Sequence, residues 1–153
     1  MATAYIGVGS NLGNREKNCY HAIELLEKRR IVVKKKSSLY ETEPWGEQDQ
    51  PQFINMALEV ETELEPYKLL RALKAIEKEM GREKTLKWGP RIIDLDILLF
   101  DALFLRDNSL QIPHPLMHER AFVLKPLCEI APEKIHPLLK ARMCDLLEKL
   151  QKS

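Results

Sequence analysis

Residues 54 to 80 pass from a period-two pattern of apolar side chains to a helical one, and this change restricts the fold more than any other feature. The even-numbered positions of the first part are apolar and would face one side of an extended chain, namely Ile54, Met56, Leu58 and Val60. Pro66 suits a first helical turn and Gly81 the position just after a helix. Between them apolar side chains recur at helical spacing, at Leu69, Leu73, Ile76 and Met80. The segment therefore predicts a strand with one buried face, followed by a helix.

The rest of the first hundred residues completes a regular order of elements. A short strand is predicted over Thr3 to Val8, and a glycine-containing turn leads to Asn14, a favourable helix N-cap. A helix should follow as far as the basic residues 28–30, which suit a helix C-terminus. Residues 31–42 look extended, and residues 91–100 are, after Arg91, apolar except for two aspartates, which predicts a central strand. This order predicts an α+β fold with a ferredoxin-like βαββαβ core, both helices lying on one face of the sheet.

The glycine-rich segment between the first strand and helix is not a phosphate loop. Residues 7–13 lack both the Lys-Ser/Thr pair and the spacing of a dinucleotide fingerprint. We expect its glycines to permit a tight turn and a close approach of the backbone to neighbouring elements.

The C-terminal third contains five prolines, which limit it to short helices and turns around a hairpin near residues 104–112. A last helix is predicted over the apolar repeat from Leu139 to Leu150, and we expect it to pack on the sheet. The length fits a single domain over residues 1–153. The sheet face opposite the first two helices is expected to be free for a ligand.

Composition excludes several classes of function. A net charge of +1 gives no global field that would attract nucleic acid or a membrane surface. The three cysteines are far apart, without zinc or dithiol spacing, and are expected to be reduced. We see no targeting segment and no apolar run near the length of about 18 residues that suggests a membrane span, so a cytoplasmic location is expected.

Asp94 and Asp96 are the strongest chemical feature of the sequence. Residues two apart in a strand point to the same face, which places these carboxylates side by side, roughly 6–7 Å apart at the backbone. Their mutual repulsion is best relieved by a divalent cation, and hard oxygen ligands with open positions favour Mg²⁺ that also carries phosphate oxygens. The alternative is a solvated pair, or a pair neutralised by the nearby Arg91.

Other groups near this strand would suit phosphate and a flat ring. Arg82, Lys84 and Lys87 form a basic loop that could close over a triphosphate, although such a run can also be an ordinary solvated loop. Phe53 and Asn55 share the strand face opposite the apolar one, where a ring and an amide would suit a flat heterocycle.

The segment Lys87-Trp88-Gly89-Pro90-Arg91-Ile92-Ile93-Asp94-Leu95-Asp96-Ile97-Leu98 resembles the signature of the 6-hydroxymethyl-7,8-dihydropterin pyrophosphokinases. The resemblance extends in order through residues 5–13, 40–44, 48–55 and 113–122, and so covers nearly the whole chain. Leu116, Lys84 and Lys87 depart from the common pattern, which has arginine more often. The resemblance implies transfer of pyrophosphate from ATP to the pterin alcohol in folate biosynthesis, with AMP as the second product.

The resemblance also implies roles for particular residues. Asp94 and Asp96 would hold two Mg²⁺ ions and, with Arg82 and Arg91, form the catalytic set. The implied nucleotide-binding residues are Leu70, Glu77, Arg82, Lys84, Arg91, Ile97, His114 and Arg120. The implied pterin-binding residues are Thr42, Pro44, Trp45, Phe53, Asn55, Trp88 and Phe122. Without the resemblance, His114 and Arg120 would be read as surface groups of a proline-rich turn.

Two other classes of function fit the sequence less well. A nucleotide-sugar transferase can use the same acidic motif but needs an α/β nucleoside-binding domain, which this order of elements does not provide. A non-catalytic ferredoxin-like nucleotide-binding module would gain nothing from two adjacent carboxylates, which repel a phosphate backbone. We therefore expect an enzyme that acts as a monomer on two small molecules, ATP and the pterin, without nucleic acid or a membrane.

Overall fold

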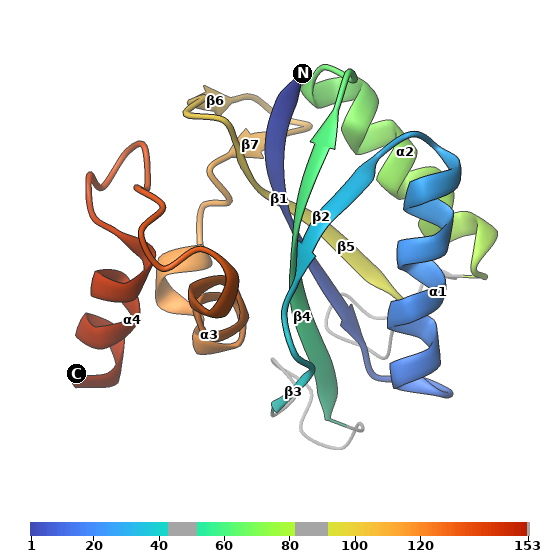
Figure 1. The fold of residues 1–153 in the computed structure, drawn as a ribbon, viewed down its shortest axis with the longest axis horizontal. Helices are drawn as coiled ribbons and strands as arrows, with labels where there is room; N and C mark the ends of the chain where they lie inside the picture. Colours follow the sequence, from blue (N-terminus) through green and yellow to red (C-terminus); the bar gives the residue numbers. More distant parts are fainter. Residues whose placement is uncertain (43–51, 82–91, 153) are drawn as a thin grey trace.

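The computed structural model describes residues 1–42, 52–81 and 92–152. An antiparallel five-stranded sheet runs in the order β2-β4-β1-β5, with β3 paired to β4, and a hairpin forms a second, small sheet (Figure 1). The large sheet consists of β1 (Ala2–Ser10), β2 (Val32–Lys36), β3 (Tyr40–Thr42), β4 (Phe53–Thr62) and β5 (Asp94–Phe100). The other elements are α1 (Arg15–Lys28), α2 (Pro66–Glu79), β6 (Leu105–Arg106), β7 (Gln111–Ile112), the 3-10 turn η1 (Met117–Glu119), α3 (Ala121–Ile130) and α4 (Met143–Lys152).

Helices α1 and α2 lie on one face of the sheet, as the ferredoxin-like prediction requires (Figure 1). The four even-numbered apolar positions of β4 are buried beneath them, which confirms the period-two prediction. Burying each such side chain contributes roughly 1.5–3 kcal/mol relative to leaving it exposed. This layer forms the larger apolar core of the protein.

The ends of both helices follow the local signals in the sequence. The Asn14 side chain accepts a hydrogen bond from the Lys17 N–H (3.1 Å) and caps α1 as predicted. Helix α2 begins at Pro66 and is capped by the side chain of Glu65. Gly81 follows the helix with φ of 87°, a left-handed conformation that glycine adopts without steric cost.

The strand that carries the aspartates lies at an edge of the sheet, so the prediction of a central strand was wrong. β5 pairs with β1 alone among the described strands. Its apolar character comes from burial on both faces, by α2 on one side and by Met117 and Leu124 on the other. Beyond β5 the chain runs alongside it, and the His114 N–H donates to the Leu98 carbonyl (3.0 Å). A covered edge strand and a central strand thus have the same apolar pattern.

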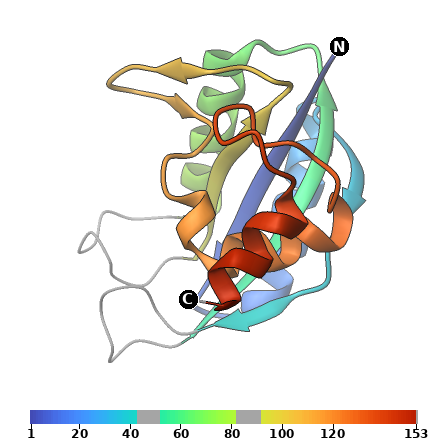
Figure 2. The ribbon, with the colours of Figure 1, turned by 90° about the vertical axis from the view of Figure 1, so that its left-hand side faces the viewer.

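The second face of the sheet is partly covered, contrary to the prediction that it would be free. Helix α3 packs on β4 over Ala57, and a second apolar cluster joins the sheet to α3 and α4. Figure 2, viewed from this side, shows both helices in front of the sheet. Helix α4 packs chiefly against α3, not directly on the sheet, and it begins at Met143, with Leu139 left exposed before it.

The extended segment 31–42 divides into β2 and β3, while β6 and β7 form the predicted hairpin. Within the described ranges no helix has both the length and the apolar composition needed to cross a bilayer.

Candidate active site

Two glycines of β1 separate the carboxylates of β5 from the amide of β4. In the sheet register Gly9 lies between Asn55 and Asp94. Two residues earlier in β1, Gly7 lies between Ala57 and Asp96. Directly paired residues of neighbouring strands point to the same face. The aspartates and Asn55 therefore share one face, and no side chain of β1 stands between them.

We call the sheet face formed by Gly7, Gly9, Asn55 and the two aspartates the floor of the site. Space above it is limited, which explains why β1 has glycine at both positions. A Cβ atom on Gly9 would meet Asn55 Oδ1 at 2.9 Å, and one on Gly7 would meet Leu98 Cδ2 at 3.4 Å. The predicted close approach of neighbouring elements is thus confirmed for Gly9. A small cavity of about 40 Å³ remains above the floor. Its lining includes both aspartates and Asn55, and Phe122 and Val123 of α3 contribute to it from the opposite side.

The acidic pair favours a cation electrostatically. Burial, together with the charges of Asp94 and Glu77, raises the pKa of Asp96 to about 7. The cations Lys74 and Arg120 act in the opposite direction but only partly offset this effect. A divalent ion would remove the repulsion and favour the ionised form of Asp96. The pair therefore fits Mg²⁺, which prefers oxygen ligands and keeps several positions for water or phosphate oxygens.

The protein supplies few ligands to such an ion. Within the part of the chain that the structure describes, no cluster of three or more His, Cys, Asp or Glu residues is arranged to hold a metal. A site with two carboxylates leaves most coordination positions open, as expected where substrate phosphates complete the shell.

Glu77 supports the acidic pair from behind the strand. This carboxylate on α2 is 3% exposed, and its Oε2 atom accepts a hydrogen bond from the Leu95 N–H (2.8 Å). Lys74 Nζ lies 3.6 Å from its other oxygen. Because Leu95 separates the two aspartates, Glu77 fixes the backbone of β5 at the site. Its implied role as a nucleotide-binding residue stays a prediction.

The structure brings His114 and Arg120 to the carboxylates, although neither stood out by its sequence pattern alone. Burial and the nearby Arg120 charge lower the pKa of His114 to about 4, so its imidazole is neutral at pH 7. Its Nδ1 atom accepts a hydrogen bond from the Leu116 N–H (3.3 Å). Burial lowers the pKa of the Arg120 guanidinium, and the charges of Asp96 and Asp94 only partly offset this effect. The guanidinium lies 5.6 Å from the centre of the Phe122 ring. Among the described residues, Arg120 is a cation that an anionic ligand here would meet.

The other predicted site residues lie in the core, on β3 or outside the described residues. Leu70 and Ile97 belong to the core beneath α1 and α2, on the face opposite the carboxylates. Thr42 pairs with Phe53 across β3 and β4, next to Asn55. Six predicted site residues lie outside the described residues, namely Pro44, Trp45, Arg82, Lys84, Trp88 and Arg91. The predicted lid over residues 82–88 lies outside them too.

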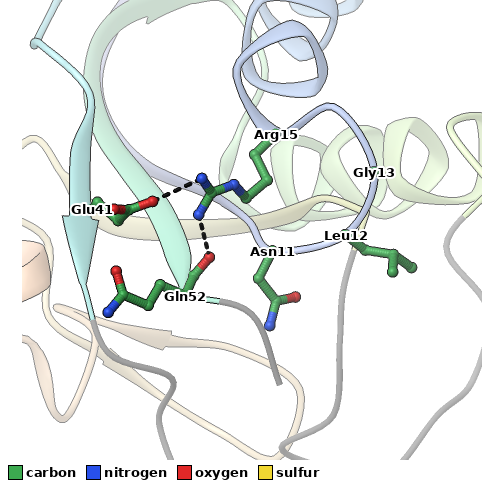
Figure 3. Close-up of a pocket in the computed structure, with 6 residues that line it drawn as sticks. All are labelled: Asn11, Leu12, Gly13, Arg15, Glu41 and Gln52. Carbon is green, nitrogen blue, oxygen red and sulfur yellow. Dashed lines mark hydrogen bonds and ion pairs between the residues drawn. The ribbon is translucent and has the colours of Figure 1, made fainter. Parts of the chain in front are cut away.

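A larger cavity of about 450 Å³ opens where the turn after β1, β3 and the residue before β4 come together (Figure 3). Asn11, Leu12 and Gly13 line it from the turn after β1, and Glu41 and Gln52 line it from β3 and the start of β4. Arg15 joins the two sides through its guanidinium. Arg15 could not be found from the sequence, because nothing in its spacing shows which strands the helix N-terminus will meet.

Together the fold and the site define a class of protein: a ferredoxin-like α+β domain whose sheet carries a pair of acidic residues on an edge strand. The family model of 7,8-dihydro-6-hydroxymethylpterin-pyrophosphokinase matches residues 5–132. The chain belongs to this family. The resemblance drawn from the sequence is thereby confirmed, as is the predicted function of pyrophosphoryl transfer in folate biosynthesis with ATP as co-substrate.

Individual relatives agree with this assignment. The chain is 50% identical to a 2-amino-4-hydroxy-6-hydroxymethyldihydropteridine pyrophosphokinase of Bacillus subtilis, over 85% of this chain and 78% of that protein. It is 44% identical to the enzyme of the same name from Aquifex aeolicus, over 92% and 87% of the two chains. The solved wild-type HPPK-DHPS of Plasmodium falciparum superimposes with a TM-score of 0.78 at 17% identity, over 97% of this chain. The chain spans only 44% of that structure, so this likeness concerns the fold of one part of it.

Proposed function

We propose that this chain binds ATP and Mg²⁺ at Asp94 and Asp96 and transfers the pyrophosphoryl group to the hydroxymethyl oxygen of 6-hydroxymethyl-7,8-dihydropterin. One observation carries the proposal: the paired carboxylates and Asn55 share a sheet face, with Gly9 between them. This arrangement would bring a metal-bound phosphate chain and the polar edge of a heterocycle side by side. Two metal ions, a monomeric state and a cytoplasmic location stay predictions from the sequence.

The chemistry needs charge neutralisation and alignment more than a strong base. Bound Mg²⁺ would neutralise phosphate oxygens and draw electron density from the β-phosphorus. The hydroxymethyl oxygen forms a bond to that phosphorus while the bond to the oxygen bridging toward the α-phosphate breaks. AMP leaves with that oxygen, and the hydroxyl proton passes to solvent. A loose transition state of this kind demands little basicity from the protein.

Arg120 and His114 would act on the phosphate side. Arg120 is a permanent cation close to both aspartates and suits a phosphate oxygen. His114 is neutral at pH 7 and would contribute hydrogen bonding rather than charge. These roles match those implied by the family resemblance.

On the pterin side Asn55 is 8% exposed at the floor, with Phe53 two residues before it on the same strand face. A carboxamide both donates and accepts hydrogen bonds, which suits the mixed polar edge of a pterin. Phe122 offers an aromatic face from α3, where ring stacking would contribute roughly 0.5–1.5 kcal/mol beyond buried area.

The proposal is tested by measuring AMP formation from ATP, Mg²⁺ and the pterin alcohol. Asp94→Asn and Asp96→Asn should each reduce the rate by at least roughly a hundredfold, because metal charge stabilisation amounts to several kcal/mol. Asp145→Asn, which changes an exposed carboxylate of α4, is the control and should retain full activity. A folded Asp94→Asn variant with normal turnover at ordinary Mg²⁺ would refute the metal assignment.

Binding measurements test the pterin pocket, and comparison with AMP formation separates an enzyme from a binding module. Asn55→Ala should weaken pterin binding by roughly one to two orders of magnitude, since an unpaired polar edge costs about 1–3 kcal/mol. ATP binding should change little in the same variant. If the wild-type protein binds ATP but forms no AMP with the pterin alcohol, the catalytic proposal fails.

A further inference from the structure

Arg15, the first residue of α1, connects three separate parts of the chain. Its Nη1 atom donates to the Gln52 carbonyl oxygen at 2.7 Å, and its Nη2 atom lies 2.7 Å from Glu41 Oε2 (Figure 3). The Arg15 side chain is 28% exposed and that of Glu41 is 52% exposed, so solvent partly screens the ion pair, while the hydrogen bond to Gln52 adds a second contact. The planar guanidinium makes both contacts at once, which an ammonium cannot do in the same geometry.

The two contacts fall on the strands that carry the pterin side of the site. Glu41 is the middle residue of β3 and pairs with Ile54 of β4. Gln52 directly precedes Phe53, which pairs with Thr42. Arg15 therefore holds β3 and the beginning of β4 toward the N-terminus of α1.

The N-terminus of α1 is in turn fixed to the end of β1. The Asn18 amide nitrogen donates to the Leu12 carbonyl (2.9 Å) and to Ser10 Oγ (3.3 Å), and Ser10 is fully buried. Gly9 directly precedes Ser10. The contacts of Arg15 thus link the backbone of β1 at Gly9 to the strand pair that presents Phe53 and Asn55.

A cation at this position is locally unfavourable, which argues for a specific role. The first turn of a helix carries a partial positive charge and is stabilised by acidic residues, not by arginine. Residues that break a local rule usually do so because a tertiary contact or a function requires them. Here the tertiary contacts to Glu41 and Gln52 offset the unfavourable dipole interaction.

We propose that Arg15 is a positioning residue for the pterin, setting the separation between the β1 floor at Gly9 and the β4 residues Phe53 and Asn55. The inference rests on the proposed pterin site. The tolerance there is small, because a Cβ atom on Gly9 would already approach Asn55 Oδ1 to 2.9 Å. A shift of the β3–β4 pair by a fraction of an ångström changes how the amide meets the ring. The phosphate side depends less on this link, because Arg15 contacts β3 and the residue before β4 directly, whereas β5 has a separate contact to Glu77.

The experiment measures KM for each substrate, kcat and the melting temperature in a set of variants. Arg15→Ala should raise KM for the pterin roughly tenfold, the size expected for losing charge-assisted hydrogen bonds, with less than a twofold change for ATP. Arg15→Lys should recover part of the loss, because an ammonium retains one of the two contacts. Glu41→Gln, which leaves the Gln52 contact intact, should give a smaller increase.

The matched control is Arg29→Ala at the other end of α1. This arginine also forms an ion pair, but its partner is Glu79 of α2 (3.6 Å) and not a residue of the sheet. Both KM values should be unchanged in this variant. A merely structural role for Arg15 would lower the melting temperature and leave KM of the folded enzyme within twofold of wild type. That result, or equal increases in KM for both substrates, overturns the inference.

Two comparisons keep the test independent of folding and of the proposed function. If Arg15→Ala does not fold, Arg15→Lys and Glu41→Gln decide the matter by the same difference between pterin and ATP. If Asn55→Ala raises KM for the pterin while folded Arg15 variants do not, the positioning role fails and the proposed pterin site stands. If Asn55→Ala has no effect either, the proposed pterin site itself is wrong.

Discussion

Gly9 keeps the floor of the site open because it has no side chain. Any larger residue would place a Cβ atom 2.9 Å from Asn55 Oδ1, closer than real contacts of this kind, and would push the amide from its position. A Cβ atom on Gly7, two residues earlier in β1, would meet only the flexible end of the Leu98 side chain, at 3.4 Å. The two glycines therefore provide a matched pair for testing how the floor positions the amide.

We predict that Gly9→Ala weakens pterin binding at least roughly tenfold, because the displaced amide loses hydrogen bonds worth about 1–3 kcal/mol. Gly7→Ala should have a smaller effect, because Leu98 can shift. Calorimetric titration of each variant with the pterin alcohol measures the difference. Equal affinities for the two variants would show that Asn55 does not depend on the gap at Gly9.

The charged groups of the site lead to a prediction about pH. The pKa of His114 is lowered to about 4 on folding, so its contribution to stability is present above its ordinary value of 6.5 and is lost as pH falls toward 4. The pKa of Asp96 is raised from 3.8 to about 7, so its contribution is present at low pH and is lost as pH rises toward 7. Between pH 4 and 7 the two effects have opposite signs and largely cancel.

Single variants should reveal the two opposing effects. In Mg²⁺-free buffer, Asp96→Asn should make the free energy of unfolding rise between pH 4.5 and 6.5, by up to about 1.4 kcal/mol per pH unit. His114→Asn should make it fall over the same range. Urea denaturation at several pH values measures both slopes. Identical slopes in the two variants would contradict the assigned pKa directions.

At the level of elements, α3 is fastened to the sheet edge by Glu129. This carboxylate accepts hydrogen bonds from the Tyr40 hydroxyl (2.6 Å), the Ser38 N–H (3.0 Å) and the Ser38 hydroxyl (3.1 Å). Its pKa is lowered by the Tyr40 hydrogen bond and by those from Ser38. Since α3 also carries Phe122, this contact helps to hold the aromatic wall of the site over the floor.

We expect Glu129→Ala to lower the free energy of unfolding by about 1 kcal/mol, a value that allows for solvent screening at an exposed site. Glu148→Ala, which removes the exposed pair with Lys152 on α4, should change it by less than about 0.5 kcal/mol. Urea denaturation at pH 7 compares the two. The Glu129 effect should diminish below pH 4, where the carboxylate takes up a proton in the unfolded chain. Equal losses from both variants would mean that α3 is held by apolar packing alone.

Elements with a clear period were predictable from the sequence, and spatial neighbours were not. The even-numbered positions of β4 and the limits of α2 came directly from apolar spacing and from Pro66 and Gly81. The edge position of β5 could not be predicted, because burial on both faces gives the same pattern as a central strand. Likewise, the aspartates were found from their spacing, but only the register of β1 shows that Gly9 lies between Asp94 and Asn55.

At the level of the whole molecule, two apolar clusters share the same strands. One lies under α1 and α2, and the other joins α3 and α4 to the opposite face. Neighbouring residues of β1, Ala4 and Tyr5, belong to different clusters, as do Ile97 and Leu98 of β5. Loss of either cluster therefore disturbs strands on which the other depends. The single domain over residues 1–153 stays a prediction.

The last prediction follows from that shared sheet. Leu73→Ala in the first cluster and Leu127→Ala in the second each truncate a fully buried side chain, and each should cost about 2–5 kcal/mol of unfolding free energy. Leu138→Ala, at a position 47% exposed, is the control and should cost far less. If the sheet couples the clusters, both core variants will still unfold in one transition, with the same midpoint by far-UV circular dichroism and by NMR signals from either cluster. A Leu127→Ala protein in which signals from α3 and α4 disappear at lower urea than those from α1 and α2 would show instead that the C-terminal layer is a separate cooperative unit.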